Sequence, residues 1–457
     1  MKDRSRSCAG ALLLGLLAAC APAVPLPAPP VEVAAPLPEM RTFAPTTPPA
    51  HGRTDNARLG RDVLDLLFVL ESGRELERFT RFEGTVRVGL RGAVPPTARM
   101  DLARLIARLR AEAGIDIVAA APGTVPGIVV EFVPARVMRA TVPEAACFVV
   151  PGVSDWAAFD ADRRSPALDW ARLETRATVA VFIPDTAAPQ EVRDCLHEEI
   201  AQGLGPLNDL WRLTDSVFND DNFHTVLTGF DMLVLRVVHD PALQSGMSRA
   251  EVAERLPRIL ERINPAGGRV APTPGTAPPS RAWAARIEAA ITPGAGRATR
   301  AAAARGALIL AEREGAEPAE RALSHFLVAR SISLADPAAA LDHYAAARAI
   351  WARLPGTAPH LAQLDMDTAV IALRAGRPEA ARGMIARALP AAAAAENAAL
   401  LSTMLMIDAV AADASGDARG ARARWLDSLG WARYGFGADD KVRARAGSIA
   451  ALSPSRS

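Results

Sequence analysis

The sequence predicts an α/β domain followed by an all-helical domain. Between about residues 56 and 265, short apolar runs typical of strands alternate with stretches of helical periodicity. From residue 283 to residue 457 the chain is rich in alanine and helical in pattern, and short breaks recur at nearly fixed spacing. A chain of 457 residues that is 50% hydrophobic has enough apolar material for two such cores.

The N-terminus predicts export and a lipid anchor. Residues 1–20 combine early basic residues with a short apolar run that ends in LAAC at residues 17–20. The run is too short to span a bilayer, which needs about 20 apolar residues, and its end resembles the lipobox of bacterial lipoproteins. That resemblance implies cleavage before Cys20 and lipidation of its thiol, and the lack of an acidic residue directly after Cys20 favours the outer over the inner membrane. An ordinary cleaved signal peptide with an incidental cysteine is the alternative.

The segment after the signal peptide predicts a tether. Residues 21–55 are rich in proline and alanine without periodicity, which is typical of an extended, semi-rigid spacer. Such a spacer would hold the folded body away from the membrane, on the periplasmic side. A net charge of +1, with arginines interleaved with acids, does not favour a nucleic acid partner. We therefore expect two partners, the membrane through the anchor and a protein or peptide.

Two cysteines remain in the exported body. Cys8 and Cys20 belong to the signal peptide and the anchor, which leaves Cys147 and Cys195. In an oxidising compartment such a pair forms a disulfide more often than two free thiols. We therefore expect a bond between them, with Cα atoms within about 7 Å of each other. A role for Cys195 as a metal ligand or a nucleophile is the alternative.

The elements of the α/β domain follow in order along the chain. A Pro- and Gly-rich stretch that carries Cys147 is predicted to be irregular. After the last strand, Asp185 or Thr186 can cap a helix over residues 188–204. The other predicted elements are strands at 84–92, 115–120, 127–134 and 177–184 and a helix at 97–114.

The predicted helix at 188–204 leads into a motif, CLHEEIAQGLGPLND at residues 195–209. It resembles the metzincin signature H-E-x-x-H-x-x-G-x-x-H, in which histidines bind zinc and the glutamate activates water. In that alignment Glu199 stands at the position of the catalytic base and Gly205 ends the helix. His197 lies about 140° from the second ligand position around the helix and cannot join the ligands. The three ligand positions hold no histidine: they are Glu198, Gln202 and Asn208.

A second stretch supports the resemblance. Residues 216–241 resemble the metzincin segment that runs from the Met-turn into the following helix, with Phe218 in place of the methionine and His239 in place of the usual tyrosine. Together the two stretches resemble an uncharacterised family of bacterial lipoproteins, a domain of unknown function, over roughly residues 75–245, from which the chain departs at Pro206. The metzincin resemblance implies a twisted mixed sheet with a long central helix.

The residue types at the ligand positions argue against a zinc site. Zinc prefers imidazole and thiolate, so one carboxylate and two amides make a poor set, although they leave weak zinc or calcium binding open. Without zinc, Glu199 has no polarised water to deprotonate. We expect no cofactor, and instead a buried polar cluster of Glu198, Gln202 and Asn208 that holds the helix to the next turn. A retained groove could still bind an extended peptide along 177–184 as an edge strand.

The C-terminal half predicts helical hairpins. Residues 266–282 have the composition of a linker, and the helical breaks that follow lie at 335–337, 376–378 and 416–418. Each break separates two helical stretches, which makes a unit of about forty residues. The run AALDHYAAARAIWARL resembles the second helix of a tetratricopeptide repeat, although that repeat has about 34 residues. A generic Ala-rich bundle is the alternative.

Three functions remain open at this stage. The first is a lipid-anchored scaffold or pseudopeptidase that binds a peptide or protein. The second is a hydrolase that uses Glu199 with an unusual metal site or with His224 from the downstream turn. The third is an envelope assembly adaptor that works only through the helical repeats at 283–457.

Overall fold

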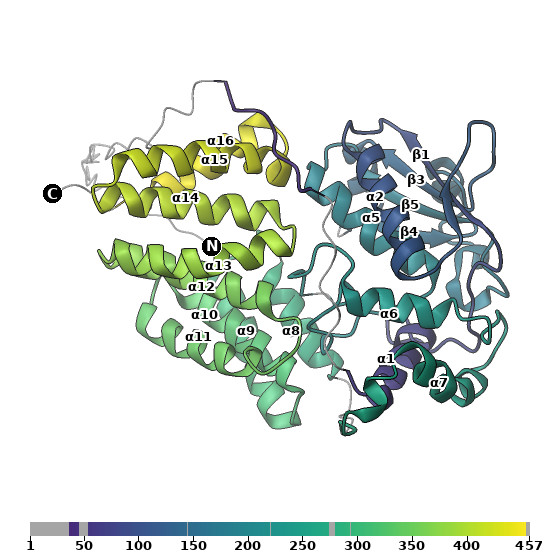
Figure 1. Ribbon diagram of the computed structural model, residues 1–457. Coiled ribbons are helices and arrows are strands. Elements are labelled where there is room, and N and C mark those ends of the chain that lie inside the picture. Colours follow the sequence, from purple (N-terminus) through teal and green to yellow (C-terminus); the bar gives the residue numbers. More distant parts are fainter. Residues whose placement is uncertain are drawn as a thin grey trace, which may run out of the picture.

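The computed structural model describes residues 36–44 and 54–453, apart from positions 144, 220, 274–278 and 293. Figure 1 shows an α/β domain and an all-helical domain next to each other, as the sequence predicts. The predicted lipidation site Cys20, with the signal peptide and much of the tether, lies outside the described residues. Within those residues, no helix combines the length and the apolar character needed to cross a membrane.

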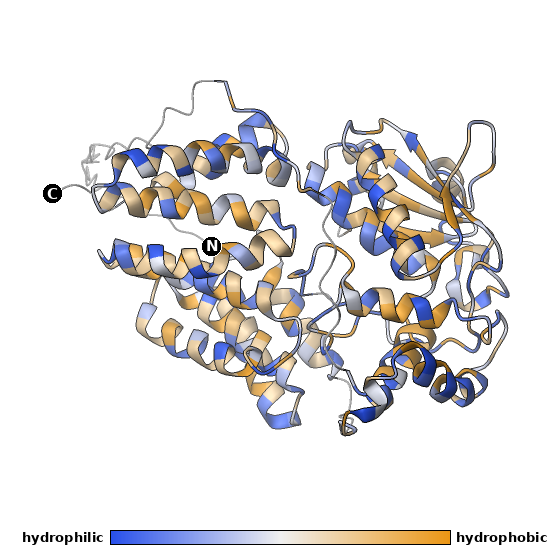
Figure 2. Cartoon of the chain, in the orientation of Figure 1, coloured by the Kyte–Doolittle hydropathy of each residue, from blue (hydrophilic) through white to orange (hydrophobic). Residues whose placement is uncertain are grey.

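Five strands form one mixed sheet in the order β2-β1-β3-β5-β4. The pairs β1–β2, β1–β3 and β3–β5 are parallel, and β4 runs antiparallel to β5. Figure 2 shows the strands as mainly hydrophobic, which is expected for a sheet covered by helices on both faces. The strands are β1 Val86–Gly92, β2 Ile117–Ala119, β3 Ile128–Val133, β4 Phe148–Pro151 and β5 Val179–Pro184.

Alternate residues of β5 contact different helices. Val181 belongs to a core that includes α2 and α5, whereas Phe182 packs with α3 and α4 on the opposite face. This alternation is the two-residue period of a strand. Helices α1, α6 and α7 pack against one another and join the α2–α5 side of the core. The helices are α1 Asn56–Phe68, α2 Ala98–Glu112, α3 Ala135–Thr141, α4 Trp156–Asp162, α5 Pro189–Leu204, α6 Gly229–Val238 and α7 Arg249–Ile263.

Two sequence expectations about this sheet are wrong. The stretch around Cys147, expected to be irregular, contains strand β4. It has only four residues, so its local pattern is too short to predict a strand, and pairing with β5 orders it. The run 177–184, expected to form an edge, is the interior strand β5, and the edges of this sheet are β2 and β4.

The helical domain consists of antiparallel hairpins. The predicted breaks at 335–337, 376–378 and 416–418 lie between α10 and α11, α12 and α13, and α14 and α15. The first helices of these hairpins begin at residues 318, 358 and 398, so the unit is 40 residues long. Buried alanines allow the helices to approach closely, around tryptophans that are fully buried. The helices are α8 Arg281–Ile291, α9 Arg297–Glu314, α10 Pro318–Ile332, α11 Pro337–Trp351, α12 Ala358–Arg374, α13 Pro378–Ala394, α14 Ala398–Ala414, α15 Ala418–Phe436 and α16 Asp439–Ala450.

The turns at one end of these hairpins contact the α/β domain. They lie at 315–317, 355–357 and 395–397, with the same 40-residue spacing as the helices that they precede. Each turn makes a polar contact to a different part of the α/β domain. The helical domain is therefore attached to the α/β domain once in every 40-residue unit. The contacts join Glu317 to Arg58 (3.0 Å), the Gly356 carbonyl to His224 (2.9 Å) and Glu396 to Arg193 (3.1 Å).

The middle turn requires a glycine. Gly356 has a φ of +68°, and a Cβ atom there would lie 2.2 Å from the Cβ of Asp215 in the α/β domain. A side chain would therefore strain the backbone and separate the two domains. In the third turn the left-handed residue is Glu396, with a φ of +52°, whose backbone carbonyl and carboxylate both accept hydrogen bonds from Arg193.

Residues 36–44, predicted as part of the tether, pack on the folded body. Phe43 is buried, with its ring centroid 4.6 Å from that of Trp431 on α15. The carbonyl of Phe43 accepts a hydrogen bond of 2.9 Å from Arg104 on α2. The described end of the tether is thus a strap that bridges the two domains, because its few apolar side chains find partners far away in the sequence.

Candidate functional site

The predicted motif lies on α5, in the middle of the α/β domain. The helix begins at Pro189, and the Glu191 carboxylate accepts a hydrogen bond of 2.6 Å from the N–H of Ala188 just before it. Helix α5 contacts α2, strands β3, β4 and β5, and α15 of the helical domain. Most of its side chains are therefore buried, including most of those of the motif, whereas Glu198, expected in the buried cluster, is only partly buried.

Gly205 ends α5, as the alignment with the metzincin signature predicts. Its φ of 178° is ordinary extended backbone, so conformational freedom is not the reason for a glycine. A Cβ atom at this position would lie 2.5 Å from Cγ1 of Val238 on α6. The close approach of α6 to the end of α5 excludes any larger residue.

A buried arginine caps the C-terminal end of α5. The Arg176 guanidinium donates hydrogen bonds to the carbonyls of Gln202 (2.7 Å), Gly203 (2.9 Å) and Gly205 (2.7 Å). It also lies 4.9 Å from the ring centroid of Trp170. Burial lowers the pKa of Arg176 to about 9. The charge still suits this position, because the unpaired carbonyls of a helix end carry partial negative charge.

Polar side chains at the end of α5 and just after it form a hydrogen-bonded cluster. Two of its members, Gln202 and Asn208, belong to the cluster that the sequence predicts. The Gln202 amide donates a long hydrogen bond of 3.4 Å to the Asp209 carboxylate, and the Asp209 N–H donates to Oδ1 of Asn208 at 3.0 Å. The Asn208 amide donates to the carbonyl of Asp65 on α1 at 3.1 Å. Asp209, to which the motif alignment assigns no role, thus links Gln202 to Asn208, and the cluster ties the end of α5 to α1.

Side chains at the predicted ligand positions take part in hydrogen bonds of their own. A side-chain amide would bind a metal through its oxygen, and Oδ1 of Asn208 already accepts the Asp209 N–H. Within the ranges that the structure describes, no group of three or more His, Cys, Asp and Glu side chains is arranged to hold a metal ion.

Glu199, at the position of the catalytic base, is a buried carboxyl. Only 6% of its surface is exposed, and its side chain forms no hydrogen bond among the described contacts. Burial first, and then the charges of Glu198 and Glu71, raise the pKa of Glu199 well above its ordinary value. Both causes favour the protonated form over what an exposed glutamate would show, and a protonated carboxyl can donate one hydrogen bond as well as accept.

We expect Glu199→Gln to change how stability depends on pH. Because the folded-state pKa is raised, the stabilising effect of protonation is fully present below the unfolded pKa, near 4.5, and is lost as the pH rises through the folded pKa. The side chain of the variant cannot ionise, so this loss does not occur in it. The free energy of unfolding of the variant, relative to that of the wild type, should therefore increase as the pH rises from 5 to 8. Urea unfolding at several pH values measures this difference, and a constant difference would contradict it.

Two histidines near the motif are structural. The sequence leaves His197 either on the surface or in packing contacts, and the structure buries it, with Nδ1 accepting a hydrogen bond of 3.1 Å from the N–H of Leu227. Burial, with Arg108 and Arg193 nearby, lowers its pKa. His224 lies at the domain junction and bonds the carbonyls of Thr214 (3.0 Å) and Gly356 (2.9 Å), and no described contact joins it to Glu199.

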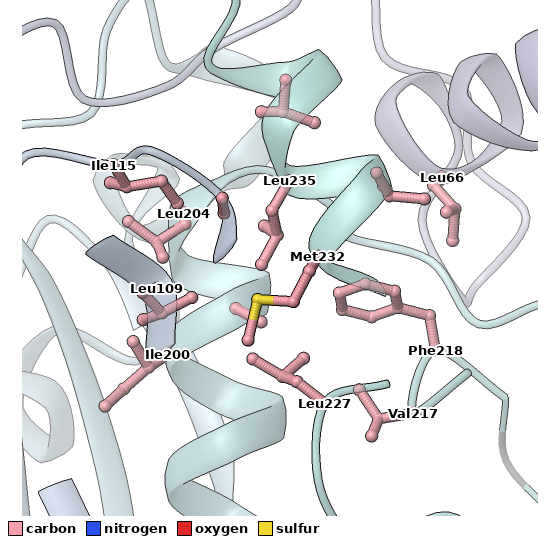
Figure 3. Close-up of a cluster of buried hydrophobic side chains, with 14 of the residues drawn as sticks. Leu66, Leu109, Ile115, Ile200, Leu204, Val217, Phe218, Leu227, Met232 and Leu235 are labelled. Atoms are coloured by element: carbon pink, nitrogen blue, oxygen red, sulfur yellow. The ribbon is translucent and has the colours of Figure 1, made fainter. Parts of the chain in front are cut away.

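The second predicted stretch forms a turn held by one aspartate. Asp231, buried at the start of α6, accepts hydrogen bonds from the Ser216 hydroxyl, the Val217 N–H (3.1 Å) and the Thr228 N–H (2.7 Å). Figure 3 shows Phe218, at the position of the methionine in the resemblance, beside Met232 of α6 in a cluster of apolar side chains that includes Ile200 and Leu204 of α5. An apolar turn thus packs against α5 where the metzincin segment would lie beneath a metal.

The disulfide prediction is confirmed. Cys147 and Cys195 are bonded, with Cα atoms 6.1 Å apart. Cys147 directly precedes β4, so the bond fixes the beginning of this edge strand to α5. Glu199 lies four residues after Cys195 on the same face of the helix. The buried carboxyl and the edge strand are therefore close in the fold.

The outer edge of β4 has no partner strand. In the described ranges, no backbone hydrogen bond leaves Phe148, Val149 or Val150 for any segment other than β5. A short 3-10 helix, Pro166–Leu168, contacts β4, and a Cβ at Gly152, just after the strand, would lie 2.8 Å from the Ala167 carbonyl. Among the described residues, the backbone of this edge still pairs with no strand other than β5, as strand addition requires.

These features define a protein with a mixed α/β domain and attached helical hairpins. Residues 56–258 match the model of a family described as a protein of unknown function (DUF2927). The match covers somewhat less than half of the 457 residues and includes the range 75–245, for which the sequence predicts an uncharacterised domain. No curated protein and no solved structure matches the chain.

Proposed function

We propose that this protein is a cell-envelope scaffold, anchored by lipid at Cys20, whose α/β domain binds an extended segment of a partner protein without cutting it. The bound segment adds to the free antiparallel edge of β4 and passes over α5 at Glu199. The observation that carries the proposal is the disulfide that fixes this edge, which pairs with no other described strand, to the helix that carries the buried carboxyl of Glu199. Strand addition supplies affinity through main-chain hydrogen bonds.

A raised pKa at Glu199 suits this role, because it favours a carboxyl that carries its proton. A peptide backbone offers both N–H and C=O groups, and a neutral carboxyl can bond to either kind. The mixed sheet, the long helix α5 and the turn held by Asp231 support the metzincin-like arrangement from which such a groove would derive. The oxygen and amide side chains at the ligand positions support binding rather than zinc-dependent cleavage.

Hydrogen exchange with selected peptides tests the proposal. Peptides are first selected against the full exported chain from a displayed random library, and exchange is then compared with and without them. We expect slower exchange of the amides in Phe148–Val150 and unchanged exchange in β2, the other edge of the same sheet. Protection confined to α8–α16 would overturn the proposal and favour an adaptor that works through its helical hairpins.

Variants at Glu199 separate binding from catalysis. Glu199→Gln keeps a neutral group that donates and accepts, so peptide affinity should fall little, whereas Glu199→Ala should weaken it about five- to thirty-fold through one lost buried hydrogen bond. A hydrolase would behave in the opposite way, because Glu199→Gln would abolish cleavage. Stoichiometric zinc in the purified protein, together with peptide cleavage that Glu199→Gln abolishes, would contradict the scaffold hypothesis.

A further inference from the structure

Two histidines face each other within the first helical hairpin. His325 on α10 and His343 on α11 have their Nδ1 atoms 3.0 Å apart, with ring centroids separated by 5.3 Å. Both side chains are partly exposed, and Figure 1 shows their two helices packed next to each other. Neither histidine takes part in the contacts between domains or in the proposed peptide groove.

We propose that Nδ1 of His325 and Nδ1 of His343 together bind one divalent transition-metal ion. Imidazole nitrogens bind such ions at about 2.0–2.1 Å. With the two nitrogens 3.0 Å apart, bonds of this length meet at the ion at about 94°. That angle fits neighbouring positions of a square or tetragonal site, which Cu²⁺ and Ni²⁺ prefer, better than the tetrahedral geometry of zinc.

Binding needs a shift of one proton within a ring and a turn of both rings that points their Nδ1 lone pairs at the ion. Without the ion, one imidazole donates from Nδ1 and the other accepts, so the donor ring carries its proton on Nδ1. To bind the ion, that ring carries the proton on Nε2 instead, and no proton is released. The partial exposure of both rings lets solvent water fill the remaining positions. The negative charge of Glu312 near His325 favours a bound cation. It acts against the positive charge of Arg321, which disfavours one.

The site is held by rigid elements. His325 and His343 lie within the antiparallel helices Pro318–Ile332 and Pro337–Trp351, each well inside its helix. Phe326, next to His325, packs on Trp351 with ring centroids 5.5 Å apart, which fixes one helix against the other. A pair of ligands held in this way loses little freedom when the ion binds.

Metal titration of the untagged exported chain tests the site. CuCl₂, NiCl₂ and ZnCl₂ are added separately in a non-chelating buffer, and heat of binding is measured by calorimetry. We expect one equivalent of Cu²⁺ to bind, and His325→Gln and His343→Gln each to weaken that binding at least tenfold. Asp342→Asn, which changes an exposed charge beside His343, serves as the matched control and should leave affinity within twofold.

A spectroscopic readout keeps the proposal falsifiable if a variant folds poorly. Electron paramagnetic resonance of the Cu²⁺-loaded wild type should show an axial signal with coupling to two nitrogens, and His343→Gln should remove one of them. A wild type that binds no copper at micromolar concentrations would overturn the proposal. So would a double variant His325→Gln/His343→Gln that binds Cu²⁺ as tightly as the wild type.

Discussion

Replacing Arg176 by methionine should lower the free energy of unfolding by about 3–5 kcal/mol. The guanidinium is 5% exposed and satisfies three carbonyls at the end of α5, and methionine can satisfy none of them. Buried acceptors left without donors carry the full cost of their removal from water. Denaturation in urea, followed by circular dichroism, measures the change.

Two further variants show whether the geometry of Arg176 is responsible. Arg172→Met changes a nearby arginine that is two-thirds exposed, and it should alter stability by less than about 0.5 kcal/mol. Arg176→Lys keeps the charge but lacks the planar fork, so it should recover only part of the loss. If Arg176→Met and Arg172→Met proved equally mild, the capping role of Arg176 would be wrong.

Removing the disulfide should cost about 4 kcal/mol in the chain-entropy model. The bond between Cys147 and Cys195 closes a loop across 48 positions of the sequence, which restricts the unfolded chain. The double variant Cys147→Ala/Cys195→Ala should unfold at a lower urea concentration than the oxidised wild type. In the folded variant, the amides of β4 should exchange faster with solvent, because β4 also loses its link to α5.

Reduced wild-type protein is the matched control for this experiment. Treatment with dithiothreitol should shift the wild type to the urea midpoint of the double variant and leave the variant unchanged. A difference between oxidised and reduced wild type below about 1 kcal/mol would contradict the prediction, since it lies far under the entropy estimate. Unchanged exchange in β4 would mean that pairing with β5 alone holds the strand.

Local patterns predict most of the regular structure. Hydrophobic runs and helical periodicity predict four of the five strands of the sheet to within a few residues, together with helices α2 and α5. Short breaks with Gly, Pro or Asp predict the hairpins of the helical domain. These elements can be predicted from the sequence because their patterns extend over many residues or repeat along the chain.

Other parts depend on contacts between distant residues. Strand β4 is four residues long and is ordered by pairing with β5 and by the disulfide. Residues 36–44 have the composition of a spacer, and only the pocket between α2 and α15 gives Phe43 its buried place. Which strand lies at the edge of a sheet is a property of topology, and no periodicity within residues 177–184 reports it.

In the candidate site, too, local features follow from the sequence, whereas contacts between distant residues do not. The motif on α5 predicts Gly205 at the end of the helix and a polar cluster with Gln202 and Asn208. It does not predict Arg176, which reaches the helix from the loop before β5 and donates to three backbone carbonyls there. Nothing in the spacing of residues reports a donor to the backbone from so far away in the chain.

The attachment of the helical domain by turns at 315–317, 355–357 and 395–397 limits how the chain can change in length. An insertion inside α10–α13 that added part of a helical turn would move a contact residue such as Glu396 away from Arg193. The opposite turns, at 335–337, 376–378 and 416–418, make no described contact with the α/β domain. Related chains that differ in length should therefore differ at those distant loops, while the number of residues in each helix stays constant.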